Sequence, residues 1–160
     1  MDPFLLDLAA DEMRTIKCAP YPARWLDFHQ HYPLVWNFIP FAEANHAQVP
    51  DQAGIYCFFV GLPPSSLPPV GYPLYVGKTE RTLRQRFIEY ISEEDHDTGR
   101  VRVRKFLKVF QGELHFAAAA FQGTHDEIMT LETAAMEALM PVYSDLGFKA
   151  ETRAKRSAWQ

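Results

Sequence analysis

The pattern of hydrophobic residues predicts three short β-strands. Residues 55–60 are β-branched and aromatic, and residues 73–76 form a shorter stretch of the same kind. Residues 114–121 form a weaker candidate, because they include four alanines. The segment 61–71 holds four prolines and two glycines, which is typical of an exposed loop. We therefore expect the first two strands to flank this loop and to pair as a hairpin.

Helical patterns alternate with these strands. Thr79 or Thr82 can cap a helix that runs to about residue 91. Residues 97–110 predict a second helix, and residues 125–140 predict a third, which ends because Pro141 cannot continue it. Strands and helices in this order indicate an α+β domain.

The first 50 residues carry a less regular pattern. Residues 1–13 favour a short helix, whereas residues 25–41 are aromatic and are interrupted by Pro33 and Pro40. We interpret residues 1–50 as an N-terminal extension packed on a main domain of residues 51–148. Residues 149–160 then form a basic C-terminal tail.

The length and composition exclude several classes of protein. A chain of 160 residues that is 48% hydrophobic and 14% aromatic suits one packed domain. No apolar run approaches the roughly 20 residues of a membrane-spanning helix, and four acidic residues precede Arg14, which is unlike a secretory signal. Two cysteines, Cys18 and Cys57, cannot supply a four-cysteine zinc site or a disulfide framework. We expect a cytoplasmic protein that does not associate with membranes.

The net charge of −4 is unevenly distributed. Residues 1–53 carry three cations and seven anions, whereas residues 78–108 carry nine cations and six anions. If residues 97–110 are helical, Arg100, Arg104 and Lys108 form one positive stripe at i, i+4 and i+8. An acidic protein can thus present a local basic surface, although a solvated charged face would give the same pattern.

Glu132 lies in the middle of an apolar stripe on the helix predicted at residues 125–140. At about 100° per residue, four apolar side chains fall within about 60° of it: Ile128, Ala135, Met136 and Leu139. A carboxylate that faces a core needs a cation or strong hydrogen bonds. Glu132 is therefore either a structural partner for an arginine or a metal ligand or catalytic acid/base at a cleft.

Arg86 shows a related pattern on the preceding helix, whose buried face is defined by Leu83, Phe87 and Tyr90. Arg86 lies at the edge of this face, so it is the arginine best placed to reach an interior group such as Glu132. Arg81 and Arg84 point towards solvent or phosphates. The alternative for Arg86 is an ordinary arginine whose aliphatic stem covers Leu83.

Four sequence elements in order resemble the signature of the GIY-YIG nuclease family. They are Gly54-Ile55-Tyr56, Tyr75-Val76-Gly77-Lys78, Leu83-x-x-Arg86-x-x-x-Tyr90, and Glu132. The resemblance covers residues from about 51 to 146. It implies a small three-stranded antiparallel sheet flanked by helices, and metal-dependent hydrolysis of a DNA phosphodiester bond. At the position where the family often has asparagine, this chain has Ser144.

The resemblance also implies roles for individual residues. Glu132 would bind one divalent ion, Mg²⁺ or Mn²⁺, and Arg86 would stabilise charge on the phosphate. Tyr56 or Tyr75 would activate water, and Tyr90 matches a further His-or-Tyr position. A phenol needs adjacent positive charge to act as a base near neutral pH, and we expect cations here to lower its pKa.

These observations favour a DNA endonuclease in restriction, repair, recombination or mobile-element defence. Its predicted DNA-binding residues are Lys78, Arg84, Arg100, Arg104 and Lys108. The alternatives are a non-catalytic interaction or adaptor module that keeps the fold, and a nuclease that acts mainly on RNA. A homodimer, or a protein partner bound through residues 1–50, is compatible with each of them.

Overall fold

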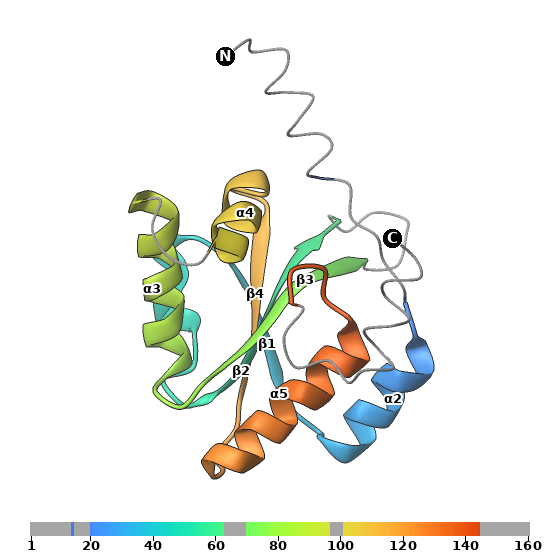
Figure 1. The fold of residues 1–160 in the computed structure, drawn as a ribbon. Helices are drawn as coiled ribbons and strands as arrows, with labels where there is room; N and C mark the ends of the chain where they lie inside the picture. Colours follow the sequence, from blue (N-terminus) through green and yellow to red (C-terminus); the bar gives the residue numbers. More distant parts are fainter. Residues whose placement is uncertain (1–13, 15–19, 63–69, 97–100, 145–160) are drawn as a thin grey trace.

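A four-stranded antiparallel sheet lies between two pairs of helices (Figure 1). The computed structural model describes residues 14, 20–62, 70–96 and 101–144. The strands, in the spatial order β1-β4-β2-β3, are β1 (Trp36–Pro40), β4 (Leu114–Ala120), β2 (Gly54–Gly61) and β3 (Gly71–Thr79). The helices are α2 (Pro22–His31), α3 (Leu83–His96), α4 (Val101–Val109) and α5 (His125–Leu139), with a 3-10 helix η1 (Glu43–Gln48).

The two faces of the sheet bury different side chains because neighbouring residues of a strand point in opposite directions. On β2, Tyr56 and Phe58 pack into a core shared with α3 and α4, whereas Ile55 and Cys57 pack into a second core with α2 and α5. The alanines of β4 follow the same alternation, since Ala117 faces the second core and Ala118 the first. The helices α3 and α4 thus cover one face, and α2 and α5 cover the other (Figure 1).

The predicted hairpin is confirmed. Strands β2 and β3 pair antiparallel from Gly54 opposite Thr79 to Gly61 opposite Gly71. The register shifts after Phe58, where the pairing passes from Tyr75 to Pro73. Proline has no N–H to donate to a regular ladder, and it is tolerated at such an irregularity because the regular hydrogen bonding is interrupted there. The loop between these strands lies mostly outside the described residues.

The expectation of three strands is wrong, because the predicted extension supplies a fourth. Strand β1 pairs antiparallel with β4, from Trp36 opposite Ala119 to Pro40 opposite His115. Pro40 ends an edge strand, a position where proline costs no hydrogen bond to a neighbour. Phe28 of α2 and Phe41 are buried in the second and first cores, respectively. Residues 20–50 therefore contribute to the sheet and to both cores.

Other element boundaries differ modestly from the expectations. Helix α3 continues to His96 rather than to about residue 91, and Thr82 rather than Thr79 caps it, because Gln85 N donates to Thr82 Oγ1 (3.1 Å). Helix α4 begins at Val101, and the expected start at residue 97 lies outside the described residues, as do the expected helix at 1–13 and the tail at 149–160. None of the described helices is long and apolar enough to span a membrane.

Strand β3 forms the other edge of the sheet, and the segment after α5 covers part of it. Tyr143 N donates to Leu74 O (2.8 Å), and Val76 N donates to Ser144 Oγ (3.1 Å). Ser144 is buried. Its hydroxyl thus satisfies the edge-strand N–H of Val76, inside the Tyr75-Val76-Gly77-Lys78 element.

Candidate active site

A cleft of about 450 Å³ lies at the β3 edge, where α3 and α5 approach from opposite faces of the sheet. Its lining residues are Tyr56, Tyr75, Gly77, Lys78, Thr79, Glu80, Arg81, Arg86 and Glu132. Four of the five residues predicted to be catalytic line this cleft. The fifth, Tyr90, is buried behind it and bonds to Arg86. Residues from β2, β3, α3 and α5 that are distant in sequence thus meet at one place.

Two glycines of the sequence motifs are required by close packing. Gly77 lies opposite Tyr56 in the hairpin, and a Cβ at Gly77 would overlap the Tyr56 hydroxyl and lie 2.5 Å from its ring carbon Cζ. The Tyr56 phenol can therefore cross β3 only over a glycine. A Cβ at Gly54 would overlap the carbonyl oxygen of Ala119 on the neighbouring strand. The first glycine permits strand pairing, and the second lets the phenol reach the cleft.

Arg86 is held by three groups on two elements. Its Nε donates to Tyr56 Oη (3.3 Å), its Nη2 to Tyr90 Oη (3.1 Å) and its Nη1 to Glu89 Oε2 (2.7 Å). The two phenols are hydrogen-bonded to each other (2.7 Å), and the guanidinium also stacks over the Tyr90 ring at 4.5 Å. These contacts leave two of the five guanidinium N–H groups for a ligand.

The pKa values of Tyr56 and Arg86 are both raised, for different physical reasons. Burial raises the pKa of Tyr56, Tyr75 adds to this effect, and Arg86 opposes it. Burial alone would lower the pKa of Arg86, but the two phenols and Glu89 outweigh it and raise that pKa above its ordinary value. Tyr56 therefore keeps its proton and Arg86 its charge. Arg86 lowers the pKa of Tyr56 as expected of a nearby cation, but burial outweighs this effect, so the pKa is raised overall.

Tyr75 occupies a more open position than Tyr56. Its side chain is only partly buried, its ring centroid lies 6.5 Å from that of Tyr56, and its ring stacks on Phe106 of α4 at 5.6 Å. The sequence predicted that the hairpin would bring both phenols to a common cleft, and the two do line the same cleft. Of the two, Tyr75 has the greater access to a water molecule in it.

Glu132 lies at the border of the buried face of α5 rather than in its middle. The buried residues of this helix are Ile128, Leu131, Ala135, Met136 and Ala138. Leu131 and Ala138 shift the centre of the face away from Glu132, because α5 packs against both the sheet and α2. Glu132 is thus partly buried and lines the cleft from the α5 side. A capping box between Thr124 and Glu127 fixes the start of this helix.

Two carboxylates near the cleft were not singled out from the sequence. Glu80 pairs with Lys78 (3.2 Å) and with His125 Nδ1 (2.9 Å), and these contacts lower its pKa. Glu89 pairs with Arg86 (2.7 Å) and with Arg81. The spacing of Glu89, three residues after Arg86 on a helix, is a signal that could have revealed this pair. The contact between Glu80 and His125 joins residues 45 positions apart and has no such signal.

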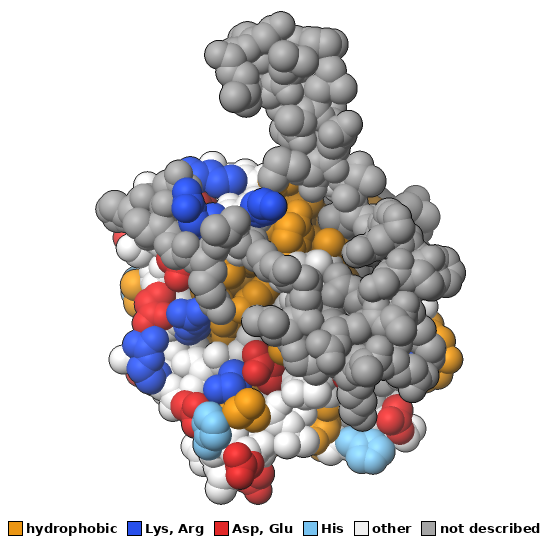
Figure 2. All heavy atoms as spheres, in the orientation of Figure 1, with side chains coloured by type: hydrophobic (Ala, Val, Ile, Leu, Met, Phe, Trp, Pro, Cys, Tyr) orange, Lys and Arg blue, Asp and Glu red, His pale blue; other side chains and the backbone are white. Residues whose placement is uncertain are grey.

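The predicted DNA-binding residues are not all in the cleft. Lys78 lines it, whereas Arg84 donates to the backbone carbonyls of Val49 (3.1 Å) and Ala47 (3.3 Å). Arg84 therefore ties α3 to the end of η1 and to the residue that follows it. On α4, Arg104 is partly buried and Lys108 is exposed, while Arg100 lies outside the described residues. Figure 2 shows Lys and Arg side chains gathered on the side of α3 and α4, interspersed with Asp and Glu.

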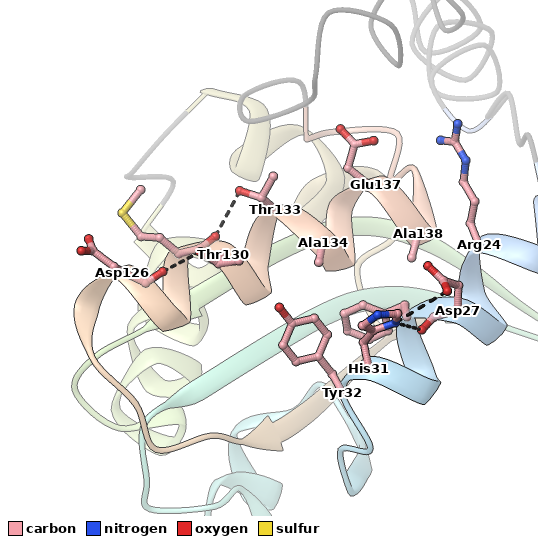
Figure 3. Close-up of a pocket in the computed structure, with 12 residues that line it drawn as sticks. Arg24, Asp27, His31, Tyr32, Asp126, Thr130, Thr133, Ala134, Glu137 and Ala138 are labelled. Carbon is pink, nitrogen blue, oxygen red and sulfur yellow. Dashed lines mark hydrogen bonds and ion pairs between the residues drawn. The ribbon is translucent and has the colours of Figure 1, made fainter.

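Two larger hollows lie elsewhere on the described surface. A groove of about 860 Å³ separates α2 from α5 and includes an ion pair between Asp27 and His31 at 3.6 Å (Figure 3). The hydroxyls of Thr130 and Thr133 in this groove donate to carbonyls of their own helix. An apolar hollow of about 770 Å³ lies on the same face of the sheet, and its lining includes Trp25, Trp36, Phe38, Phe59 and Leu139. None of the residues predicted from the motifs lines either hollow.

In comparisons with known proteins, no family model, no curated protein and no solved structure matches this chain.

The donor set of the cleft is compatible with one hard divalent cation. Among the described residues, no group of three or more His, Cys, Asp or Glu side chains could hold a metal ion by itself. Mg²⁺ does not require such a group, because it commonly binds through one or two carboxylates and completes its shell with water and substrate phosphate. Glu132 supplies one carboxylate to the cleft, and Glu80, which also lines it, is committed to Lys78 and His125.

Proposed function

We propose that this protein is a GIY-YIG-type endonuclease that hydrolyses DNA phosphodiester bonds with the help of Mg²⁺ or Mn²⁺. The observation that carries the proposal is the meeting of Tyr56, Tyr75, Arg86 and Glu132, from four different elements, around one cleft with Lys78. The motif order alone would allow these residues to be structural. A shared cleft with a preorganised arginine supports a catalytic role.

The proposed binding of a phosphate begins with Arg86. Its two remaining N–H groups are directed by fixed contacts to Tyr56, Tyr90 and Glu89. A guanidinium held in this way can stabilise charge that develops on the phosphate oxygens without reorganising. Lys78 adds a second positive charge from β3. Tyr56 then acts as a neutral positioning group for Arg86, because its raised pKa keeps it protonated.

Tyr75 is proposed to accept a proton from the attacking water in its phenolate form, after its own proton has been released to solvent. A new P–O bond forms as the water loses this proton, and the bond to the leaving oxygen breaks. Glu132 would hold the divalent ion, which when bound supplies Lewis-acid stabilisation of the phosphate and leaving oxygen. Each role follows from the position of the side chain: Tyr75 from the open part of β3, and Glu132 from α5 on the opposite side.

The test is digestion of supercoiled, linear, branched and single-stranded DNA, with an RNA of matched length, across a series of divalent ions. The proposal predicts nicking or linearisation of DNA in Mg²⁺ or Mn²⁺ and none in EDTA. Cleavage confined to RNA would show that the substrate is RNA rather than DNA, while the proposed hydrolytic mechanism would stand. Absence of cleavage of every substrate, by protein shown to be folded, would contradict the proposal and favour a non-catalytic module.

A further inference from the structure

The turn between β3 and α3 holds two adjacent residues of opposite charge whose side chains reach different helices. Glu80 reaches α5, where both of its carboxylate oxygens lie 2.9 Å from His125 Nδ1. Arg81 reaches α3, where its Nη2 donates to Glu89 Oε1. Thr79 helps to fix this turn, because its buried hydroxyl accepts a hydrogen bond from Arg81 N (3.2 Å).

Each contact is made close to a proposed catalytic residue. His125 is the first residue of α5 and lies two helical turns before Glu132. Glu89 lies between Arg86 and Tyr90 in the sequence, and its other oxygen accepts from Arg86. The turn thus connects the part of α5 that precedes the proposed metal ligand with the part of α3 that carries the proposed phosphate ligand.

The arrangement of the sheet explains why such a connection matters. Helices α3 and α5 cover opposite faces, so Arg86 and Glu132 approach each other only around the β3 edge (Figure 1). The hydrophobic core fixes each helix against its own face. The distance across the edge depends in addition on groups that touch both helices there, and the turn that directly follows β3 is one of them.

We propose that Glu80 and Arg81 act as a strap that sets the separation of α3 and α5 across the cleft, which makes both of them positioning residues. This inference rests on the proposed function for its catalytic consequence. The strap also orients Lys78, whose Nζ lies 3.2 Å from Glu80 Oε2. The ion pairs of the strap are largely exposed, so they contribute little to global stability. Their effect is on geometry, to which reaction rates respond steeply.

The kinetic test compares Glu80→Gln, Arg81→Gln and the double variant with wild-type protein under steady-state conditions in Mg²⁺. Each single variant is expected to lower kcat about tenfold, with KM within about twofold of wild type and an unchanged Tm. The matched control is His31→Gln, which removes an exposed histidine from the Asp27 pair in the α2–α5 groove and should leave kcat unchanged. A raised KM with normal kcat would overturn the strap, because it would make these residues direct substrate contacts.

A charge-swap experiment tests whether the pairing of Glu80 with His125, rather than the charge at either position, is what matters. Glu80→His and His125→Glu should each lower kcat, and the double swap should recover most of it by restoring the pair in reverse. A glutamate at the first position of α5 is compatible with the helix dipole, so the swap preserves the helix start. Failure of the double swap to exceed either single variant would contradict the Glu80 arm of the strap.

A spectroscopic measurement tests the strap without relying on catalysis. Spin labels are placed at exposed positions on the two helices, through Ile88→Cys and Met129→Cys in a Cys18→Ser background, while Cys57 stays buried. The distance distribution between the labels should broaden or shift in the double variant and not in the His31→Gln control. An unchanged distribution would overturn the strap. If wild-type protein does not cleave, the positioning role falls with the proposed function, and the distance measurement still decides the structural claim.

Discussion

Tyr56 and Tyr75 lie on neighbouring strands of one hairpin, yet their surroundings give them different chemistry. Tyr56 is 1% exposed and hydrogen-bonds to both Tyr90 and Arg86, whereas Tyr75 is partly exposed at the cleft. A buried phenol with a raised pKa is a poor proton acceptor near neutral pH. We therefore assign water activation to Tyr75 and the support of Arg86 to Tyr56.

Phenylalanine substitutions separate these two roles. Tyr75→Phe should lower the single-turnover rate by about 10²-fold or more, because it removes the proposed proton acceptor. Tyr56→Phe should lower the rate and also destabilise the fold by about 1 kcal/mol, because two buried donors or acceptors lose their partner. Single-turnover cleavage and urea unfolding of both variants check these expectations. A Tyr75→Phe variant that cleaves at the wild-type rate would rule out Tyr75 as the base.

Alkaline pH should destabilise the protein through Cys57. Burial raises the pKa of this thiol to about 12 from its ordinary value near 9. Between these values the unfolded thiol has lost its proton while the folded one retains it, so raising the pH favours unfolding by about 1.4 kcal/mol per pH unit. Tyr56 adds a loss of the same sign above pH 10. When the free energy of unfolding is measured from pH 8 to pH 11, it should fall less steeply with pH for Cys57→Ala than for wild type. Equal slopes would contradict the burial of an ionisable thiol.

At the scale of single residues, the sequence predicted which side chains share the cleft better than it predicted their protonation states. The order of Tyr56, Tyr75, Arg86 and Glu132 predicted one site, and the structure places all four at one cleft. The pKa of Tyr56 could not be anticipated, because it depends on burial among residues from other elements, such as Tyr75 of β3, Tyr90 of α3 and Phe116 of β4. The support of Arg86 by Glu89 was accessible from helical spacing, whereas that of Glu80 by His125 required the tertiary structure.

At the scale of the strands, alanine substitutions of the two motif glycines, Gly54 on β2 and Gly77 on β3, should differ in their effects on stability. Gly54→Ala should destabilise the protein by about 3 kcal/mol or more, because the obstacle is the backbone carbonyl of Ala119, which cannot move without breaking the β2–β4 ladder. Gly77→Ala should cost less, about 1–2 kcal/mol, because the obstacle is the Tyr56 ring. The latter substitution displaces Tyr56 from Arg86, so its main effect should be on cleavage.

Denaturant unfolding and single-turnover cleavage of both alanine variants test this contrast. The expected result is a folded Gly77→Ala protein with a strongly reduced rate and a markedly less stable Gly54→Ala protein. Equal stabilities with normal cleavage by Gly77→Ala would contradict the role given to the Tyr56–Arg86 contact.

Helix α4 carries two of the three residues of the predicted basic stripe, Arg104 and Lys108, and the third, Arg100, lies outside the described residues. Lys108 is exposed on this helix, one turn after Arg104. If this surface binds the DNA backbone, Lys108→Glu should weaken binding and lower the slope of log K against log salt by about 1 for each phosphate that the protein no longer neutralises. Titrations at several salt concentrations, in Ca²⁺ to prevent turnover, measure the slope. Lys105→Glu is the control on the same helix, and equal slopes for wild type and Lys108→Glu would make the stripe a solvated face.

At the scale of the whole molecule, the described part of the N-terminal extension belongs to the domain. Strand β1 completes the sheet, and Phe28 and Phe41 enter the two cores. The sequence did not predict this strand, because Trp36–Pro40 is short, ends in a proline and presents Phe38 to solvent at 69% exposure. A strand that is specified mainly by its pairing with β4 carries little local signal. The hairpin, whose strands are β-branched and aromatic, and α5, which has a long helical periodicity, were predicted correctly because their signals are local.

The central claim is that the cleft hydrolyses DNA with a cation held by Glu132. The most direct measurement is single-turnover cleavage of plasmid DNA at saturating Mg²⁺ by wild-type protein and by Glu132→Gln. Glutamine keeps the shape of the side chain and removes the charge that holds a hard cation. We expect the variant to keep the wild-type Tm and to bind DNA without metal, yet to show no detectable cleavage. Cleavage by Glu132→Gln at the wild-type rate would contradict the claim.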